Sequence, residues 1–262
     1  MNAAQTLHLA LPHFQSFSIL LVRIAGIISV FPILNTRTIP TPLKAGLVTM
    51  LGLVLTPIIR LPSLPTDPAT VAAGVGNEFL IGLTIGLAVR LLFSGFQMAG
   101  ELIGTQMGFS AIQLFDPTTH QNAPLIAQFQ LTLGSLVFLS LNAHLLVVHA
   151  IGMSYEFVPP FAATLSDNLA DDIIRLTQNM LAVALKLAAP VFATLLIVNA
   201  ILSILGRAVT QMNVFVLSFP ITIAAGLFAM GLALPFTLSL FEREFMTLVE
   251  NMLALLKVLG HG

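Results

Sequence analysis

The sequence predicts an all-α integral membrane protein. Of its 262 residues, 57% are hydrophobic and only 8% are charged, whereas ordinary globular domains carry about 45–50% apolar and about 25% charged residues. A chain this poor in charge cannot cover its own surface with polar groups, so most of that surface must face lipid or other apolar protein. The apolar residues also gather into runs of about 20 residues, which is the length that a helix needs to cross a bilayer.

Six apolar stretches qualify as candidate spans by length. They run over residues 17–34, 43–59, 71–93, 125–153, 180–205 and 214–241. Proline-rich segments follow the first two stretches. We interpret these segments as connectors, since proline ends helices and favours extended turns. Three more prolines fall inside the last two stretches, where we expect them to interrupt the helices: Pro190, Pro220 and Pro235. The tail, residues 242–262, predicts an amphipathic helix that lies at the membrane interface or against a partner.

Composition and motifs argue against several classes of function. The formal net charge of −1 gives no electrostatic basis for nucleic-acid binding. The absence of cysteine excludes disulfides, thiolate metal sites and a cysteine nucleophile. No triad pattern and no phosphate-binding loop is present. His144 and His149 have no carboxylate nearby in the sequence, so we interpret them as interior histidines rather than metal ligands. We therefore expect no catalytic residues, no metal and no cofactor.

Two charged residues inside spans predict an intramembrane ion pair. Arg23 lies in the first stretch and Glu78 in the third. A charge within a span costs about 2.5–3.5 kcal/mol on insertion scales, and such groups usually pair or face a polar cavity. Pairing Arg23 with Glu78 would offset much of both costs. The pair would either lock the helices together or take part in gating or partner contact.

Small residues mark one face of the third stretch. Gly82 and Gly86 follow Glu78 at steps of four, and Gly100 and Gly104 repeat that spacing beyond it. Small residues at this interval let helices approach closely, so we favour close packing inside an assembly. A proton relay through Glu78 and Glu101 is the alternative.

The segment from Gly108 to Pro124 combines turn residues with bulky apolar side chains. Such a loop suits a movable plug, because irregular backbone at membrane depth is tolerated only where it is buried in protein or lines a cavity, and apolar constrictions close water-filled paths by dewetting. Gly108 would be the pivot, and Phe109, Ile112 and Phe115 would supply the bulk. Asp116 and Pro117 would form a rigid corner. An ordinary surface loop with a few buried anchors is the alternative.

Several motifs resemble one family along nearly the whole chain. They comprise Arg23, Gly26 and Pro32; Ile39, Pro40 and Lys44; Glu78, Gly82 and Gly86; the run from Ala99 to Gly108; Asp116 and Pro117; Pro190 and Asn199; and Arg207, the run from Gln211 to Phe215, Phe219 and Pro220. The chain thereby resembles the FliR family of the bacterial type III export apparatus, flagellar rather than injectisome in type. Thr210 and Ser218 depart from the family pattern, which has proline and glycine there, and Asn142 stands in a loose match to a Gly-His pair.

The resemblance implies kinked helical hairpins that form a single domain over residues 1–262. These hairpins pack with FliP-like and FliQ-like membrane subunits into a hetero-oligomeric helical export gate, with which an FlhB-like protein associates. The gate lies in the bacterial inner membrane at the centre of the flagellar basal body. Unfolded export substrates pass through it, and the loop matching Gly108–Pro124 plugs the closed channel. No enzymatic activity is implied for this chain.

Within that expectation, two further groups of residues have roles. Gln106 and Met107 would lie beside the channel and lead into the plug. A turn that contacts a partner would be formed by Arg207, Gln211, Met212 and Asn213.

Two alternative functions belong to other classes of protein. A secondary transporter of a small solute would place a midplane site at helices broken by Pro190 and Pro220, and an intramembrane enzyme would use Glu78, Glu101 or the histidines.

Overall fold

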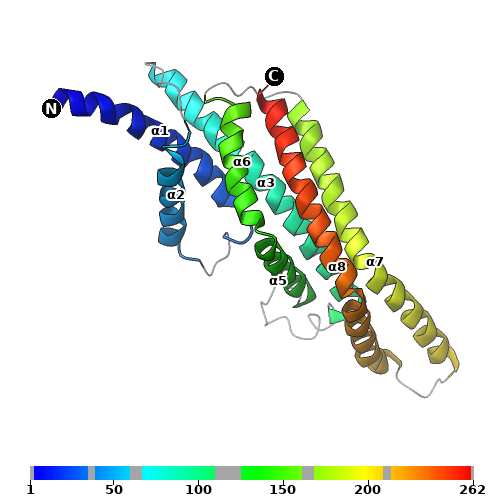
Figure 1. Cartoon of the computed structure of the whole chain (residues 1–262). Helices are drawn as coiled ribbons and strands as arrows, with labels where there is room; N and C mark the ends of the chain where they lie inside the picture. The colour runs from blue at the N-terminus through cyan, green and yellow to red at the C-terminus, as the bar shows by residue number, and fades with distance from the viewer. Residues whose placement is uncertain are drawn as a thin grey trace. The chain divides into compact units, whose positions relative to one another are not determined.

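Every element that the structure describes is an α-helix. The computed structural model describes residues 3–34, 39–59, 67–109, 125–160, 168–208 and 214–260, and no strand occurs in these ranges. The helices are α1 (Ala3–Val30), α2 (Thr41–Leu55), α3 (Pro68–Gln106), α5 (Leu125–Ser140), α6 (Ala143–Phe157), α7 (Asn168–Ala208) and α8 (Val214–Gly260) (Figure 1). The prediction of an all-α protein is confirmed.

Fewer of these helices are long enough to cross a membrane than the six stretches suggest. Helices α3, α7 and α8 qualify by length and composition, and α5 with α6 could form a fourth, broken span. Helix α2 has 15 residues, which at 1.5 Å per residue is about 23 Å and falls short of the roughly 30 Å hydrocarbon core. The apolar part of α1, Phe14–Val30, is also short. Among the described residues, the expectation of six spans is therefore replaced by three or four.

The prolines do not interrupt their helices as expected. Helix α7 continues through Pro190, and α8 continues through Pro220 and Pro235 into the tail. Proline costs about 3 kcal/mol in a helix interior, but an apolar environment offers no water to backbone groups outside a helix, so the helix persists around the proline. The broken helices that a small-solute transporter would require are therefore absent at Pro190 and Pro220.

A real break does occur inside the stretch predicted over residues 125–153. Helix α5 ends at Ser140 and α6 begins after Asn142, whose φ of 53° is left-handed. Asn142 is the one non-glycine residue with positive φ in the part of the chain that the structure describes. Asparagine tolerates this conformation better than most other side chains do.

The first turn of α3 is capped by Asp67. One carboxylate oxygen, Oδ2, accepts hydrogen bonds from the Thr70 hydroxyl at 2.7 Å and from the Thr70 backbone N–H at 3.0 Å. These bonds, chiefly the one from the hydroxyl, lower the pKa of Asp67 below its ordinary value of 3.8. Pro68 follows at the first helical position, where its missing N–H would have no partner within the helix. Together the two residues fix the start of α3.

Contacts divide the chain into two compact units, each with its own core. Unit 1 comprises residues 1–91, 142–176 and 246–262, and unit 2 comprises residues 92–141 and 177–245. Helices α1, α2 and α6 and the first part of α3 belong to unit 1. The end of α3, all of α5 and most of α7 and α8 belong to unit 2. The single domain over residues 1–262 stays a prediction.

Unit 2 is built around a cluster of phenylalanine rings from three helices and a long α7–α8 pair. The rings are Phe93, Phe96, Phe138, Phe241 and Phe245, all at most 1% exposed, with centroid separations of 3.9–5.8 Å. Several pairs adopt the edge-on geometry that aromatic quadrupoles favour. Helices α7 and α8 lie side by side in this unit (Figure 1) and share a second core cluster that includes Val191 and Ala229.

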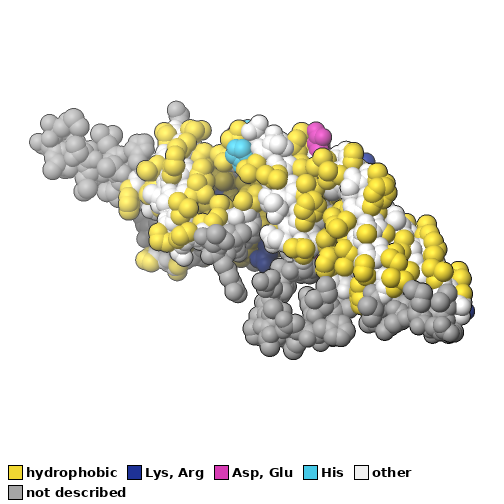
Figure 2. Space-filling view, turned by 90° about the horizontal axis from the view of Figure 1, so that it is seen from below, with side chains coloured by type: hydrophobic (Ala, Val, Ile, Leu, Met, Phe, Trp, Pro, Cys, Tyr) yellow, Lys and Arg dark blue, Asp and Glu magenta, His cyan; other side chains and the backbone are white. Residues whose placement is uncertain are grey.

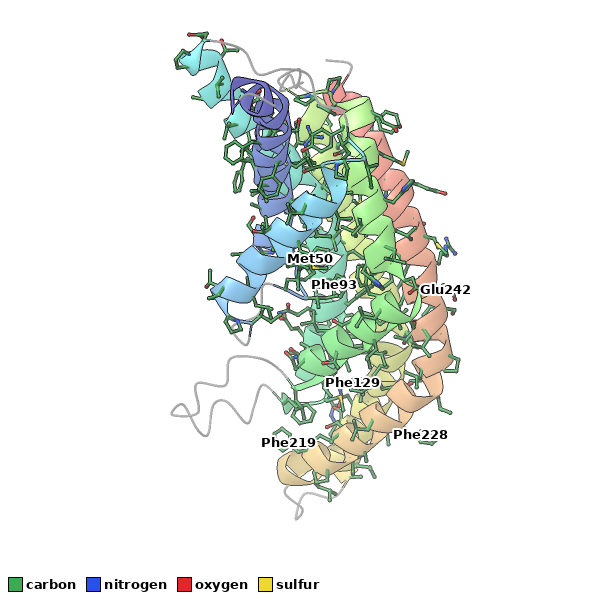
Figure 3. All side chains as sticks on the ribbon, turned by 60° about the vertical axis from the view of Figure 1, so that its left-hand side comes forward. Met50, Phe93, Phe129, Phe219, Phe228 and Glu242 are labelled. Carbon is green, nitrogen blue, oxygen red and sulfur yellow. The ribbon has the colours of Figure 1, made fainter. Side chains whose placement is uncertain are left out.

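The outer faces of α7 and α8 are apolar. Figure 2 shows hydrophobic side chains over much of the face in view. The exposed large apolar residues of the two helices include Leu185, Leu196, Ile197, Ile201, Ile204, Phe228 and Leu232. In Figure 3, Phe93 lies among the helices, whereas Phe228, 70% exposed, points away from α8. Apolar exposure on this scale requires lipid or other protein as its neighbour.

Candidate functional site

The structure brings Arg23 and Glu78 together in the core of unit 1. Arg23 Nε donates to Glu78 Oε2 at 2.7 Å, and Arg23 Nη2 donates to Glu78 Oε1 at 3.0 Å. Both side chains are fully buried. This fork-to-fork arrangement uses the planar geometry of the guanidinium to engage both carboxylate oxygens.

Helix α6 completes the surroundings of Arg23. Arg23 Nη1 donates to Ser154 Oγ at 2.8 Å, and Nη2 also donates to the Val158 carbonyl at 3.2 Å. The ring of Tyr155 lies 3.6 Å from the guanidinium carbon, a cation–π contact. The guanidinium therefore ties together α1, α3 and the end of α6. Sequence reasoning missed the three α6 groups, because neither a lone serine nor a backbone carbonyl leaves a signal in a sequence.

Glycines allow α1 and α3, the helices that carry Arg23 and Glu78, to approach closely. A β-carbon at Gly82 would collide with the Arg23 backbone carbonyl, and one at Gly86 would lie 2.7 Å from the Ile27 carbonyl oxygen. On α1, Gly26 makes the corresponding close contact: a β-carbon at position 26 would lie 2.5 Å from the Phe79 carbonyl oxygen of α3. The backbones of α1 and α3 thus touch at small residues, which is how such residues let helices approach in membranes.

The C-terminal end of α3 lies in the core of unit 2. Gln106 is the last helical residue, and Met107 is fully buried in a cluster with Ile103, Ile126 and Leu195. Gly108 then turns the chain with φ +90°, a backbone conformation that residues other than glycine rarely adopt. Phe109 packs, half-buried, against the same cluster.

Helix α8 holds this end of α3 through three contacts. Thr222 Oγ1 donates to the Met107 carbonyl at 3.0 Å. The Met107 side chain fills the space where Gly226 has no β-carbon. Phe219, near the start of α8 (Figure 3), covers Gly108. Sequence reasoning did not identify Thr222 or Gly226, since neither residue type is unusual within an apolar helix.

Several predicted site residues lie outside the described part of the chain. These are Ile112, Phe115, Asp116 and Pro117 of the plug, and Gln211, Met212 and Asn213 of the turn. Arg207 is described and exposed in the last turn of α7, and Gln106 is half-buried. The roles assigned to these residues stay predictions.

The two histidines are not interior residues. His144 and His149 are both exposed on α6, so the interpretation as buried histidines is wrong. His149 instead lines a cavity of about 530 Å³ in unit 1. The other lining residues include Leu55 at the end of α2, Ile58 just after that helix and Glu156 on α6. No cluster of three or more metal-ligating side chains occurs among the residues described.

The other predicted acid, Glu101, bonds within its own helix. Its Oε1 accepts a hydrogen bond from Gln97 Nε2 at 2.9 Å. Glu78 is engaged by Arg23, as described above. Both carboxylates are therefore engaged by neighbouring side chains of the chain itself.

Comparison with known proteins identifies the family. The sequence model of the bacterial export proteins, family 1, matches residues 14–248. A protein of Pectobacterium carotovorum subsp. carotovorum is 35% identical over 217 residues, which cover 82% of each chain. A protein of Escherichia coli (strain K12) is 30% identical over 89% of each chain.

A third relative, from Bacillus subtilis (strain 168), is 30% identical over 254 residues, which cover 94% of this chain and 96% of its own length. All three relatives bear the name flagellar biosynthetic protein FliR. The family model runs through both units, from residue 14 to residue 248, and so spans the Arg23 cluster and the α3–α8 junction. The chain belongs to the FliR family of bacterial export proteins.

Proposed function

We propose that this chain is a non-enzymatic subunit of the flagellar protein export gate. It helps to form and seal the channel through which unfolded substrates cross the bacterial inner membrane. Family membership supports a place in the flagellar export apparatus, and the apolar faces of α7 and α8 suit a subunit that packs among other helices. The sealing role depends on the segment that leaves the end of α3.

The observation that carries the sealing role is the way α3 ends. A helix of 39 residues stops at Gln106, and Met107 anchors its end in an apolar core. Gly108 then redirects the chain through a left-handed turn. A segment that begins at a rigid anchor and a defined turn can be directed at one place, as a plug requires.

Residues beyond Phe109 provide the material of the plug in this proposal. Ile112 and Phe115 fill the closed lumen, because large apolar side chains exclude water from a narrow path. Asp116 and Pro117 fix the corner at which the segment turns back toward α5. Gln106 and Met107 lie beside the channel, and Phe109 forms the root of the plug on the core of unit 2.

The partners of this chain follow from the same proposal. FliP-like and FliQ-like subunits share one hetero-oligomer with it, and an FlhB-like protein associates with that assembly. The turn formed by Arg207, Gln211, Met212 and Asn213 contacts a neighbouring subunit. The Arg23–Glu78 cluster maintains the packing of α1, α3 and α6 in the assembled gate.

The test replaces residues 110–124 by a Gly/Ser linker of the same length. Because Gly108 and Phe109 pack against the core, starting the replacement at residue 110 leaves the described packing intact, which deletion from Gly108 would not. We expect normal assembly and an increased ion leak through the complex, measured as conductance in planar bilayers or as membrane depolarisation in cells.

A matched control replaces residues 161–167, the connector between α6 and α7, with Gly/Ser. This control complex should assemble and conduct as the unmodified one does. If the fully assembled 110–124 variant conducts no more than the control, the plug is rejected.

A further inference from the structure

We propose that the junction of α3 with α8 is a latch that holds the root of the plug closed and opens during export. The latch consists of Met107 and Gly108 on one side and Phe219, Thr222 and Gly226 on the other. This inference rests on the proposed function, because it names the part of the chain that must move when the plug leaves the channel.

The hydroxyl of Thr222 has alternative acceptors on both helices. It lies 3.0 Å from the Met107 carbonyl oxygen and, within its own helix, 3.0 Å from the Ser218 and 3.2 Å from the Phe219 carbonyl oxygen. A hydroxyl has one proton to donate, so it can bond across to α3 or back into α8. Back-bonding of threonine to the carbonyl four residues earlier is common in helices. Separation of α3 from α8 therefore leaves the Thr222 donor satisfied in both states.

The Met107 side chain fits a notch in α8. A β-carbon at position 226 would lie 2.6 Å from Met107 Cγ and 2.9 Å from its sulfur, so only glycine leaves room for it. Methionine is unbranched and flexible, and it can leave such a notch without strain. Phe219 covers Gly108 with its ring edge, where a β-carbon would lie 2.9 Å from Phe219 Cδ1.

The contact of α3 with α5 is of a different kind. At Gly100 a β-carbon would lie 2.8 Å from both the Ala127 nitrogen and the Ile126 carbonyl oxygen, so this contact joins backbone to backbone. Packed backbones cannot rearrange by changing rotamers, whereas the α3–α8 contact depends on side chains and one exchangeable hydrogen bond. We therefore assign the motion to the first turns of α8, with α3 and α5 staying together.

Pro220 lies within the moving part of α8. It has no N–H to donate to the helix, and kinks in helices occur mostly at prolines. It stands between Phe219 and Thr222, two of the three latch residues of α8. The helix can therefore bend at the point where the latch residues must swing away from Met107.

A reversible crosslink tests the latch in the assembled export gate. The chain contains no cysteine, so a Met107→Cys, Gly226→Cys pair is the only thiol pair within it. A cysteine sulfur at position 107 takes the place of Met107 Cγ, which is within disulfide reach of position 226. We expect diamide oxidation to stop export of a flagellar substrate and dithiothreitol to restore it.

The matched control is the pair Gly104→Cys, Ile126→Cys, which staples α3 to α5. A β-carbon at position 104 would lie 3.6 Å from Ile126 Cβ, a normal separation for a disulfide. Oxidation of this pair should leave export unchanged. Met107→Cys alone should show the same level of export under oxidising and reducing conditions, because it has no second thiol to bond.

Two substitutions test the hydrogen bond itself. Thr222→Val keeps the shape of the side chain but removes the donor, and we expect it to increase ion leak. Thr222→Ser keeps the hydroxyl and should not leak. Equal leak in both variants would assign the effect to packing and remove the hydrogen bond from the latch.

Two crosslinking outcomes would overturn the proposal. Export that continues through a fully oxidised 107–226 pair shows that the junction does not open, and an equal block by the 104–126 pair shows that α3 itself must move. Neither outcome affects the plug, because the linker variant of residues 110–124 tests that separately. A leaking linker variant with a harmless 107–226 crosslink would reject the latch alone.

Discussion

Arg23 brings a full charge into a fully buried position. Removing a guanidinium from water costs several kcal/mol, and only good pairing geometry offsets that cost. Here the guanidinium is engaged by both oxygens of Glu78, by the Ser154 hydroxyl and by the Val158 carbonyl. The arrangement leaves either charge of the pair strongly dependent on the other.

Replacing one member of the pair should be worse than replacing both. We expect Arg23→Ala or Glu78→Ala alone to destabilise the protein by about 3–5 kcal/mol, because each leaves an uncompensated buried charge. The double variant removes both charges and should recover part of that loss. Unfolding of the detergent-solubilised protein in denaturant measures the difference.

Arg90→Ala is a suitable control, since Arg90 is exposed on α3 and its replacement should change stability little. The pairing account fails if the double variant is no more stable than either single one.

Prediction from sequence succeeded unevenly for single residues. The cost of an intramembrane charge was sufficient to associate Arg23 with Glu78, although 55 residues separate them. It could not identify Ser154, because a serine on an apolar helix carries no charge to be neutralised. The histidines were misjudged for a related reason: histidine occurs in both buried and exposed positions, and both residues proved to be exposed on α6.

Helix α3 shows how one element combines several tasks. Its first part holds Glu78 within unit 1, its middle packs on α1 through Gly82 and Gly86, and its end anchors Met107 in unit 2. The glycines occur at the four-residue spacing seen in the sequence, so the packing face was predictable. The continuation of α7 and α8 through three prolines was not predictable. Every helix-propensity scale ranks proline as a helix breaker, but it does not include the apolar surroundings that favour a continuous helix.

The glycine contacts give a test on the scale of the helix. Gly82→Ala should destabilise the protein by about 1–3 kcal/mol, because a methyl group would be forced against the Arg23 backbone. Thermal unfolding in detergent would report the loss.

Gly76→Ala is the matched control on the same helix, since nothing lies within 4 Å of its β-carbon position. Alanine is favoured over glycine within helices by about 0.5–1 kcal/mol, so this variant should be neutral or more stable. Equal effects at positions 76 and 82 would show that α1 and α3 do not pack as described.

At the scale of the whole chain, many large apolar side chains are exposed, because no other described residue of the chain covers them. Exposed leucine and isoleucine side chains follow α7, from Leu181 to Ile204, and α8 adds Phe228 and Leu232. Composition predicted this property directly, because 8% charged residues cannot solvate a surface. Composition could not predict how many helices span the membrane, since that number depends on where each helix ends and on how α5 and α6 break at Asn142.

Co-expression gives the corresponding prediction for the whole molecule. Expressed with FliP-like and FliQ-like proteins of the same organism, this chain should be recovered in one complex, whose intact mass includes all three kinds of subunit. Expressed alone, it should not form an export-competent oligomer. A functional assembly made only of copies of this chain would contradict the proposed function.

The buried Arg23 cluster also affects the order of events during biosynthesis. Arg23 is made 55 residues before Glu78, a delay of about 3 to 11 s at the usual rate of about 5–20 residues per second. The first helix therefore emerges with a charge that lipid cannot solvate. Ser154, the next hydrogen-bond partner of Arg23, is made later still, 131 residues after it. We expect α1 to remain at the translocon or the headgroup layer until α3 arrives, so that the two enter the membrane as a pair.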